Sequence, residues 1–377
     1  MKMIETPYDW QIKAVRDLAT CKRGLIKTPP GAGKTLVAVL AIQRMLDLTT
    51  TGEVIVLVPT TELKTQWYNA INEKIFPPEN RSRIVIETFS MVGRFLKQYP
   101  NAEMKKFMMA VIDEAHKTHS PVFSNIYKLN AEYWLGLSAT PSDECYRKFG
   151  KVLVDLSWED AKLSNFTIHF IEVDLNDKEK SDYDRFTELI KNGYREKYRD
   201  EKKLLFLSLR RRDIVHRVKN KLDCAINLIM QNKDKRMMVF GERINQIEKI
   251  ASVLDEKKMP YAILHSNREE RFDDYKDKKI NILLSSRMLR EGFNDPSAEI
   301  GIVISFPLTR TTHVQTIGRL VRYMDGKNAK IYYIIANDTT DEKMILDAQR
   351  TYGKERVVID LPLTTTITTT ITDDIWG

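Results

Sequence analysis

One short segment carries residue types that bind phosphate. Residues 28–35 read Thr-Pro-Pro-Gly-Ala-Gly-Lys-Thr, between a short apolar run and a longer apolar stretch with helical spacing. Glycines let successive backbone N–H groups turn toward phosphate oxygens, and a helix start adds the positive end of its dipole. Lys34 offers a charge to the β- and γ-phosphates, and Thr35 offers a hydroxyl to Mg²⁺. We therefore predict a nucleotide-binding loop, whose backbone part is formed by Gly31, Ala32 and Gly33.

A pair of acidic residues follows another apolar run. Residues 108–112 are apolar and lead into Asp113-Glu114-Ala115-His116. An acidic residue at the carboxyl end of a buried strand, in a sheet that also carries a phosphate loop, can hold Mg²⁺ through its water shell. A neighbouring carboxylate can orient and deprotonate an attacking water. Alone, such a pair is typical of a helix start. Together with the lysine loop, it predicts Asp113 as the magnesium ligand and Glu114 as the general base.

Two arginines and a glutamine lie at helical spacing late in the chain. Gln315, Arg319 and Arg322 share one face of a predicted helix in residues 315–322. Such guanidiniums can be solvated surface groups. They can also enter a nucleotide site as arginine fingers, which contribute ~10³–10⁵ in rate. The spacing alone leaves both roles open, and a catalytic role for Gln315, Arg319 and Arg322 is implied only by the family resemblance of this segment.

The elements that must position these residues appear as two groups of short apolar runs. The first group is 24–26, 54–58, 84–86, 108–112 and 134–137, and the second is 237–240, 262–264, 282–284, 300–304 and 331–335. Strands that alternate with helical stretches predict a parallel sheet covered by helices on both faces. We therefore expect an α/β protein with a first lobe at residues 1–157, a helical insert at 158–235, a second lobe at 236–360 and a threonine-rich tail at 361–377.

The insert is basic. Between residues 174 and 236 there are 18 basic and 12 acidic residues, an excess of six, whereas the whole chain has a net charge of +8. Apolar residues repeat there at helical spacing, and we predict that Arg210, Arg211 and Arg212 open an amphipathic helix that forms a nucleic-acid-binding surface. The alternative is a helix that docks on a lobe while its arginines face water.

Composition excludes several classes of protein. The 377 residues are 42% hydrophobic and 30% charged, which is sufficient for buried cores. No apolar stretch approaches the ~20 residues that a membrane helix needs, and no hydrophobic signal segment opens the chain. The three cysteines show no metal-binding spacing. We expect a cytoplasmic protein, in the host cytoplasm if it is viral, with no membrane contact.

These motifs resemble those of the superfamily 2 helicases and translocases. Residues 31–35 resemble motif I, 113–116 motif II, 138–140 motif III and 315–322 motif VI. Weaker matches are Gln11 and residues 58–63, 88–90, 239–241 and 285–296. The resemblance runs in the correct order from residue 8 to residue 322. It implies two tandem RecA-like lobes that use ATP and Mg²⁺.

The resemblance also implies roles for single residues. Gln11, with Tyr8 beside it, would read adenine, and Glu291 and Gly292 would complete the nucleotide site. Ser138, Thr140 and His116 would couple hydrolysis to movement, with His116 meeting Gln315. Contacts to nucleic-acid phosphates would come from Thr60, Thr88, Ser285 and Ser286. Where the family has an aspartate two residues after Gly292, this chain has Asn294 followed by Asp295.

The residues in and around the motifs indicate the kind of motor. Residues 8–11, the loop at 28–35 and the Glu-Gly-Phe at 291–293 look like those of DNA translocases grouped with type III restriction motors, such as compact phage recombination helicases of the UvsW kind. This implies a monomer that remodels duplex, forked or branched DNA, by unwinding or branch migration, in replication, recombination or repair. The alternatives are an RNA helicase, the motor part of a restriction system, and an ATPase or GTPase switch that binds a protein.

Overall fold

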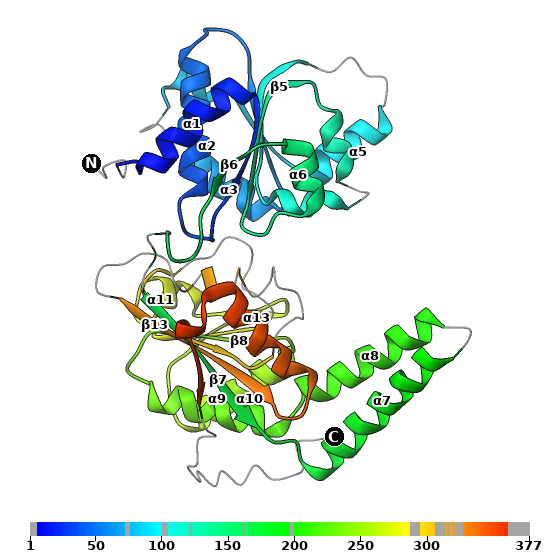
Figure 1. Ribbon diagram of the computed structural model, residues 1–377. Coiled ribbons are helices and arrows are strands. Elements are labelled where there is room, and N and C mark those ends of the chain that lie inside the picture. The colour runs from blue at the N-terminus through cyan, green and yellow to red at the C-terminus, as the bar shows by residue number, and fades with distance from the viewer. Residues whose placement is uncertain are drawn as a thin grey trace. The chain divides into compact units, whose positions relative to one another are not determined.

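The computed structural model describes residues 6–71, 76–99, 105–120, 123–161, 163, 165–196, 200–286, 295–305, 314, 317–318, 320 and 327–360. The chain divides into two compact units. Unit 1 comprises Met1–Leu163, Arg290–Asn294 and Val314–Tyr323, and unit 2 comprises Ser164–Leu289, Asp295–His313 and Met324–Gly377. Figure 1 shows a sheet with helices in each unit. The threonine-rich segment 361–377 lies outside the described residues.

Unit 1 is built on a parallel sheet with the strand order β3-β2-β4-β5-β1-β6. The strands are β1 Arg23–Lys27, β2 Val54–Val58, β3 Ile84–Thr88, β4 Phe107–Ile112, β5 Ala131–Ser138 and β6 Val152–Asp155. All five runs predicted for this lobe are strands. The central strands β2 and β4 carry side chains buried on both faces, which explains why they read as continuous apolar runs rather than as alternating ones.

Helices cover both faces of this sheet. They are α1 Asp9–Cys21, α2 Lys34–Asp47, α3 Thr61–Ala70, α4 Pro78–Arg81, α5 Phe89–Gln98 and α6 Asp143–Phe149, with 3₁₀ turns at η1 Ala115–His119 and η2 Ser124–Lys128. One face packs Leu18, Ile42 and Trp67 against the strands. The opposite face packs Phe89 and Phe149. The two cores fix the sheet edge where the predicted motifs lie.

Unit 2 has a second sheet with the order β10-β9-β11-β8-β12-β13-β7-β14. Its strands are β7 Asn165–Val173, β8 Met237–Gly241, β9 Ala262–His265, β10 Arg268–Glu270, β11 Ile282–Ser286, β12 Ile300–Val303, β13 Asn328–Ala336 and β14 Val357–Asp360. Only the β9–β10 pair is antiparallel among these. Packed with them are α9 Lys219–Gln231, α10 Ile244–Glu256, α11 Phe272–Lys276, η3 Thr340–Glu342, α13 Lys343–Tyr352 and η4 Lys354–Arg356.

The lobe boundaries predicted from sequence need a correction. Residues 165–173 were assigned to the helical insert, but they form β7, which pairs with β13 and β14 in the second sheet. Helix α9 also packs in this core, through Leu222 and Ile229 among others. The insert is therefore confined to the two helices between β7 and α9.

Those two helices form a hairpin that projects from unit 2 (Figure 1). They are α7 Asp177–Arg195, opened by a capping box between Asn176 and Glu179, and α8 Glu201–His216. The prediction that Arg210–Arg212 open a helix is wrong, because α8 begins nine residues earlier and ends at His216. Ile190, Leu204 and Leu207 hold the hairpin together.

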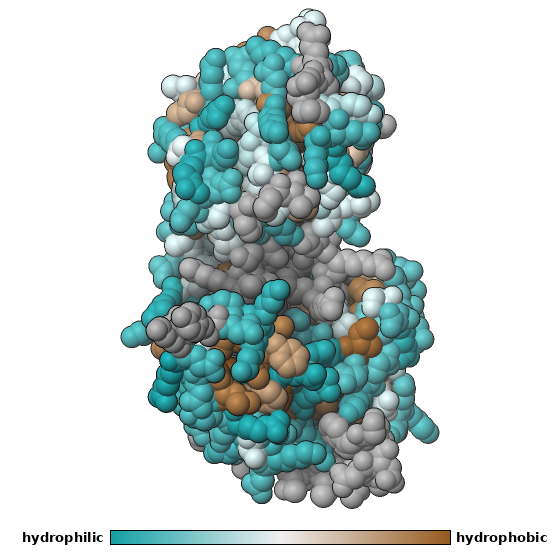
Figure 2. Space-filling model, turned by 90° about the vertical axis from the view of Figure 1, so that its right-hand side faces the viewer, coloured by the Kyte–Doolittle hydropathy of each residue, from teal (hydrophilic) through white to brown (hydrophobic). Residues whose placement is uncertain are grey.

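The hairpin also exposes apolar side chains. Leu205, Phe206 and Leu209 are each more than half exposed. Figure 2 looks onto the side from which the hairpin projects, and it shows hydrophobic side chains gathered on unit 2 among hydrophilic ones. In the part of the chain that the structure describes, no helix is both long and apolar enough to cross a membrane.

Candidate functional site

The predicted phosphate loop joins β1 to α2. Gly31 and Gly33 have φ values of 87° and 98°, in the left-handed region that favours glycine. A Cβ at Gly33 would lie 2.6 Å from Gln11 Nε2, so a larger residue would displace the Gln11 amide. The Lys34 amine curls over the loop and donates to the carbonyl oxygens of Thr28, at 3.0 Å, and Pro29, at 3.2 Å. The cationic group is therefore held where the oxygens of a bound triphosphate could take over from these carbonyls.

Gln11 ties the first helix to this loop. Its side chain is buried, its Nε2 donates to the carbonyl oxygen of Gly33 at 3.1 Å, and its Oε1 accepts from the Tyr8 amide at 2.9 Å. Both ends of the Gln11 amide thus have partners within the protein. Its contact with adenine stays a prediction, and the structure adds a role in fixing the loop.

Asp113 lies at the carboxyl end of β4. Its carboxylate accepts from Trp67 Nε1 and from the Glu114 amide, each at 2.9 Å. Burial, and next the repulsion from Glu114, raise the pKa of Asp113 to about 6, although the charge of Lys34 acts in the opposite direction. A buried carboxylate beside another acid favours a cation. Sequence reasoning missed Trp67, whose one signal is a large aromatic residue among the polar residues of α3.

Motifs II and III are in direct contact. His116 Nδ1 and Ser138 Oγ are 3.1 Å apart, and Ser138 Oγ accepts from the Thr140 amide at 3.2 Å. His116 Nδ1 also lies 3.4 Å from Glu114 Oε2. Glu114 itself has a φ of 48°, an uncommon conformation for a residue with a side chain and one found often at functional sites. A polar chain therefore connects the predicted general base to the predicted coupling motif.

The sheet explains why these groups meet. Strand β5, which ends in Ser138, lies between β1 and β4 and pairs in parallel with both. The carboxyl ends of the three strands lie at one edge, where parallel α/β sheets bind ligands. The described residues contain no group of three or more His, Cys, Asp or Glu side chains that could hold a metal ion. Thr35 and Asp113 stay the predicted magnesium ligands, and proteins usually bind Mg²⁺ through one or two carboxylates together with substrate phosphates.

Five predicted site residues lie outside the described residues: Gln315, Arg319, Arg322, Glu291 and Gly292. Asp295, beside the departure at Asn294, is described and is buried. It accepts from Arg236 Nε at 2.6 Å, and the Arg236 guanidinium stacks 3.8 Å from the centroid of the Tyr275 ring. Asp295 therefore belongs to a buried ion pair of the second core and does not replace the family's aspartate in a ligand contact.

Thr60 and Thr88 both cap helices at the carboxyl edge of the first sheet. The Thr60 hydroxyl accepts from the Leu63 amide and the Thr88 hydroxyl from the Met91 amide, each at 3.3 Å. Thr60 follows β2 and Thr88 is the last residue of the adjacent strand β3, so their helix N-termini lie side by side. Helix N-termini favour anions. The predicted phosphate contacts of these two threonines are compatible with this placement.

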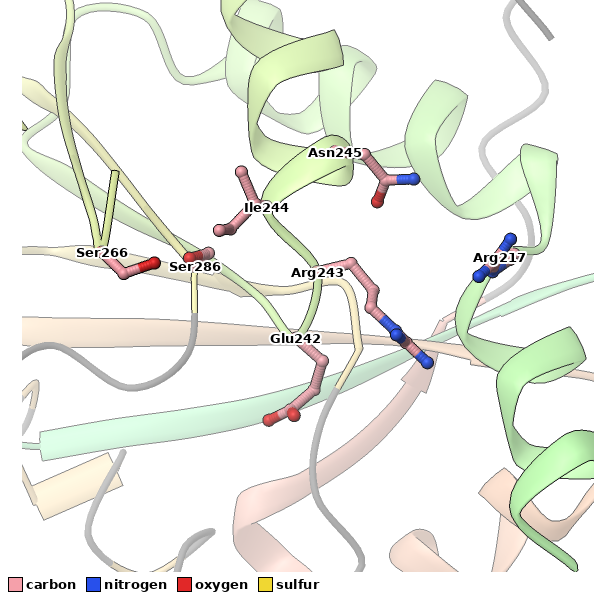
Figure 3. A pocket seen from close by; sticks show the side chains of 7 residues that line it. All are labelled: Arg217, Glu242, Arg243, Ile244, Asn245, Ser266 and Ser286. Carbon is pink, nitrogen blue, oxygen red and sulfur yellow. The ribbon is translucent and has the colours of Figure 1, made fainter. Parts of the chain in front are cut away.

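The two serines of motif V differ. Ser285 is buried, and its hydroxyl donates to the carbonyl oxygen of Leu264 at 3.1 Å, so it is directed into the sheet and is unsuited to the predicted phosphate contact. Ser286 instead lines a pocket of about 390 Å³ (Figure 3). The pocket opens at the ends of β8, β9 and β11, and it is lined by Arg217, Glu242, Arg243, Ile244, Asn245, Ser266 and Ser286. Sequence reasoning missed its two arginines.

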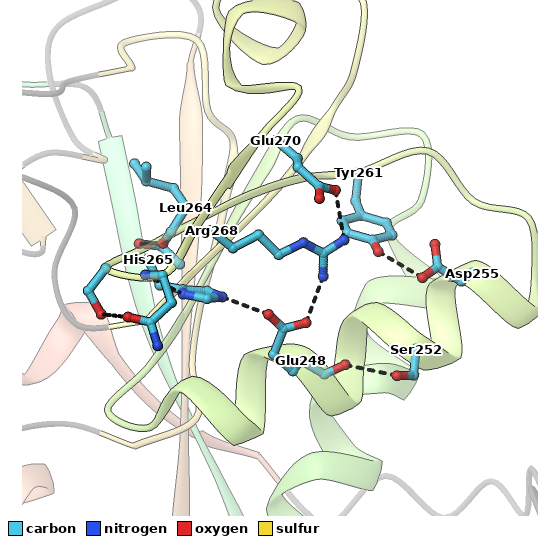
Figure 4. A network of polar contacts seen from close by, with 11 residues as sticks. Glu248, Ser252, Asp255, Tyr261, Leu264, His265, Arg268 and Glu270 are labelled. Atoms are coloured by element: carbon cyan, nitrogen blue, oxygen red, sulfur yellow. Dashed lines mark hydrogen bonds and ion pairs between the residues drawn. The ribbon is translucent and has the colours of Figure 1, made fainter.

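A polar network holds the loop that carries Ser266 (Figure 4). The Glu248 carboxylate on α10 lies 2.7 Å from His265 Nε2 and accepts from Arg268 at 2.6 Å. His265 Nδ1 accepts from the Asn267 amide at 3.2 Å, so its proton is on Nε2 and is donated to Glu248. The network fixes one wall of the pocket.

The three hairpin arginines have unequal surroundings. Arg210 is exposed, with its guanidinium 5.2 Å from the centroid of the Phe206 ring. Arg211 donates to Thr187 Oγ1 at 3.3 Å, and Arg212 donates to His216 Nε2 at 3.3 Å. Of the three, Arg210 alone is exposed.

Two family models match the chain. Residues 4–143 match "Type III restriction enzyme, res subunit", and residues 220–324 match "Helicase conserved C-terminal domain". Among curated relatives, the DNA 3'-5' translocase XPB2 of Sulfurisphaera tokodaii is 26% identical over 89% of this chain and 83% of its own length. The DNA 3'-5' helicase XPB of Mycobacterium tuberculosis is 23% identical over 90% and 63%. Putative helicase 22 of a Sulfolobus islandicus filamentous virus is 24% identical over 85% and 62%. The chain thus spans less than two thirds of the last two.

Solved structures share the fold. The type ISP restriction-modification enzyme LlaBIII bound to DNA matches with a TM-score of 0.70 at 15% identity, over 98% of this chain and 32% of that one. The Pyrococcus furiosus Hef helicase domain gives 0.59 at 16% identity, over 91% and 98%. Yeast Dbp5 bound to RNA and ADP BeF3 gives 0.61 at 13% identity, over 94% of each chain. The two predicted RecA-like lobes are confirmed.

Proposed function

We propose that this superfamily 2 helicase, a nucleic-acid-dependent ATPase, is a motor that moves along DNA and remodels it. The observation that carries this proposal is the shared sheet edge of unit 1. There Asp113 lies within the electrostatic influence of Lys34, and the acidic motif is hydrogen-bonded through His116 to Ser138. A phosphate-binding lysine, a metal-binding acid and a coupling motif thus form one connected set.

ATP is the proposed fuel. Lys34, the loop amides and Thr35 would hold the triphosphate, and Asp113 would hold Mg²⁺, which when bound neutralises negative charge on the phosphates. Glu114 would accept the proton of the attacking water. Arg319 and Arg322 would stabilise charge that develops on the transferred phosphate.

DNA is the proposed track, in duplex or branched form. Three features support it: the two threonine-capped helix N-termini of unit 1, the pocket with Arg217, Arg243 and Ser286 in unit 2, and the hairpin with exposed Arg210. Several curated relatives that match along about nine tenths of this chain carry names of DNA 3'-5' helicases or translocases, and we propose the same polarity here. Fork unwinding and branch migration, in replication, recombination or repair, are the proposed tasks.

Two alternative functions are an RNA helicase and the motor part of a restriction system. Putative RNA helicases also match the chain, but only over 126 and 159 residues. A restriction motor is favoured by the likeness to LlaBIII, of which this chain covers 32%. Relatives named DNA helicases or translocases, in contrast to the putative RNA helicases, match over 85% or more of this chain.

One set of measurements tests the proposal. ATPase rates are compared with single-stranded DNA, duplex, fork, Holliday junction and RNA, with Lys34→Ala as the blank. We expect the strongest stimulation by duplex or branched DNA. Stimulation by RNA alone would favour the RNA helicase, and hydrolysis indifferent to every nucleic acid would favour a switch ATPase and overturn the proposal. Displacement of a triplex strand from either end of a duplex tests the polarity.

A further inference from the structure

One carboxylate forms ion pairs with both arginines of the unit 2 pocket. Asp213 lies in the last turn of α8, and its Oδ2 forms an ion pair with Arg217 Nε at 3.0 Å. Its Oδ1 is paired with the guanidinium of Arg243, at the start of α10. In Figure 3 the Arg243 side chain extends toward the segment that carries Arg217. Asp213 thus connects the hairpin to the pocket wall.

The surroundings of the two guanidiniums suit an anion. Both arginine side chains are about half exposed, at 58% and 45%, whereas Asp213 is 21% exposed. The pocket also offers the hydroxyls of Ser266 and Ser286 and the N-terminal end of α10. Glu242, the acid that lines the pocket, extends away from both guanidiniums in Figure 3.

We propose that Asp213 is an internal competitor of nucleic-acid phosphate, which occupies Arg217 and Arg243 until a phosphate of the DNA backbone displaces it. Carboxylate and phosphate oxygens accept from guanidinium N–H groups with the same geometry, so both acceptors use the same donors. This inference rests on the proposed DNA-binding function. It specifies that DNA must break the ion pairs of Asp213 with Arg217 and Arg243 when it binds unit 2.

The exchange has a consequence for the hairpin. When a phosphate takes the guanidiniums, α8 loses its ion pair with Arg243. A second contact remains, because Gln246 Nε2 still donates to the His216 carbonyl oxygen at 2.5 Å. Phosphate binding therefore loosens the base of the hairpin without detaching it.

The test removes the competing charge. Asp213→Asn should bind a labelled 30-base-pair duplex more tightly without nucleotide, by on the order of two- to fivefold, as expected for a partly exposed ion pair. The slope of log affinity against log salt should steepen by about 0.9, since the site then holds one more uncompensated positive charge. Asp184→Asn, which removes an equal charge from the exposed surface of α7, is the matched control and should change neither quantity comparably.

A double-mutant cycle locates the effect. In an Arg217→Gln, Arg243→Gln background, Asp213→Asn should add no affinity, because the competed donors are gone. Asp213→Glu keeps the charge and should bind DNA as the wild type does, which guards against a folding defect in the asparagine variant. An equal gain in Asp184→Asn, or a gain that survives without the arginines, would overturn the competitor role while leaving DNA binding intact. Failure of the wild-type protein to bind any DNA would instead overturn the proposed function.

Discussion

His116 and Ser138, 22 residues apart in the chain, are joined by a hydrogen bond of 3.1 Å between Nδ1 and Oγ. The bond connects the loop after β4, which carries the predicted general base, to the end of β5. Ser138 Oγ in turn accepts from the amide of Thr140. A change at the acidic motif can therefore reach the segment that follows β5 through two hydrogen bonds.

Ser138→Ala removes both of these bonds and should uncouple hydrolysis from DNA. We expect ATP binding and basal hydrolysis close to those of the wild type, with DNA stimulation reduced about five- to tenfold, which corresponds to a net loss of about 1 kcal/mol for the two hydrogen bonds. Ser142→Ala, in the same connection between β5 and α6, is the control. Steady-state ATPase with and without duplex measures both. Equal stimulation in the wild type and Ser138→Ala would contradict the coupling role.

Lys34 and Glu114 should separate binding from chemistry. Lys34→Ala is expected to weaken ATP binding, because the loop loses its cation. Glu114→Gln should still bind ATP but turn over about 10²–10⁴-fold more slowly, as expected for a lost general base. Fluorescent-nucleotide titration and single-turnover hydrolysis measure the two steps. Retained turnover in Glu114→Gln would remove this residue from its assigned role.

Arg319 and Arg322, outside the described residues, stay a prediction from sequence. Alanine at either position should lower ATP turnover by about 10³–10⁵-fold, the range for an arginine finger. DNA affinity without nucleotide should hardly change, because the two guanidiniums are predicted to contact the phosphoryl group that is transferred during hydrolysis. Turnover and fluorescence anisotropy test this together, and normal hydrolysis by both variants would show that they are surface residues.

The hairpin arginines should not behave alike. Arg210→Ala is expected to flatten the salt dependence of duplex binding by about 0.9, the contribution of one phosphate contact. Arg211→Ala should leave that slope nearly unchanged, because Arg211 is engaged by Thr187 and the ring of Tyr183. It should instead lower the unfolding midpoint of the hairpin. An unchanged slope in Arg210→Ala would show that the hairpin is only a connector.

Lys327 makes stability depend on pH. Burial lowers the pKa of Lys327 from 10.5 to about 8, even though Asp295 and Glu299 favour the charged form. The unfolded chain therefore holds more protons than the folded one between about pH 8 and pH 10.5, so Lys327 lowers stability below pH 8 and this cost fades as the pH rises. Lys327→Met should stabilise the protein at pH 7 by about 1 kcal/mol, after the loss of the bond to the Pro296 carbonyl oxygen. Urea unfolding followed by circular dichroism at pH 7 and pH 9.5 should show the gain at the lower pH alone.

Much of the fold was determined by sequence because its signals are local. Buried parallel strands are short apolar runs whatever their neighbours, so residues 54–58 and 237–240 could be predicted as strands before any pairing was known. The phosphate loop and the acidic pair are equally local, since each follows one strand directly. Lys34 and Asp113 could therefore be assigned from a few adjacent residues.

Tertiary structure decided the contacts between distant residues. Strand β7 pairs with residues 328–336 and 357–360, an order that the periodicity of residues 165–173 does not contain. The neighbouring hydroxyls of Ser285 and Ser286 have different surroundings for the same reason. Successive side chains of a strand point to opposite faces. Only the packed sheet determines that Ser285 is directed inward while Ser286 lines a pocket. The pairing of Asp213 with Arg243, 30 residues away, depends on how α8 meets α10. Local pattern specifies which elements form, and the packing of those elements against one another determines which side chains meet.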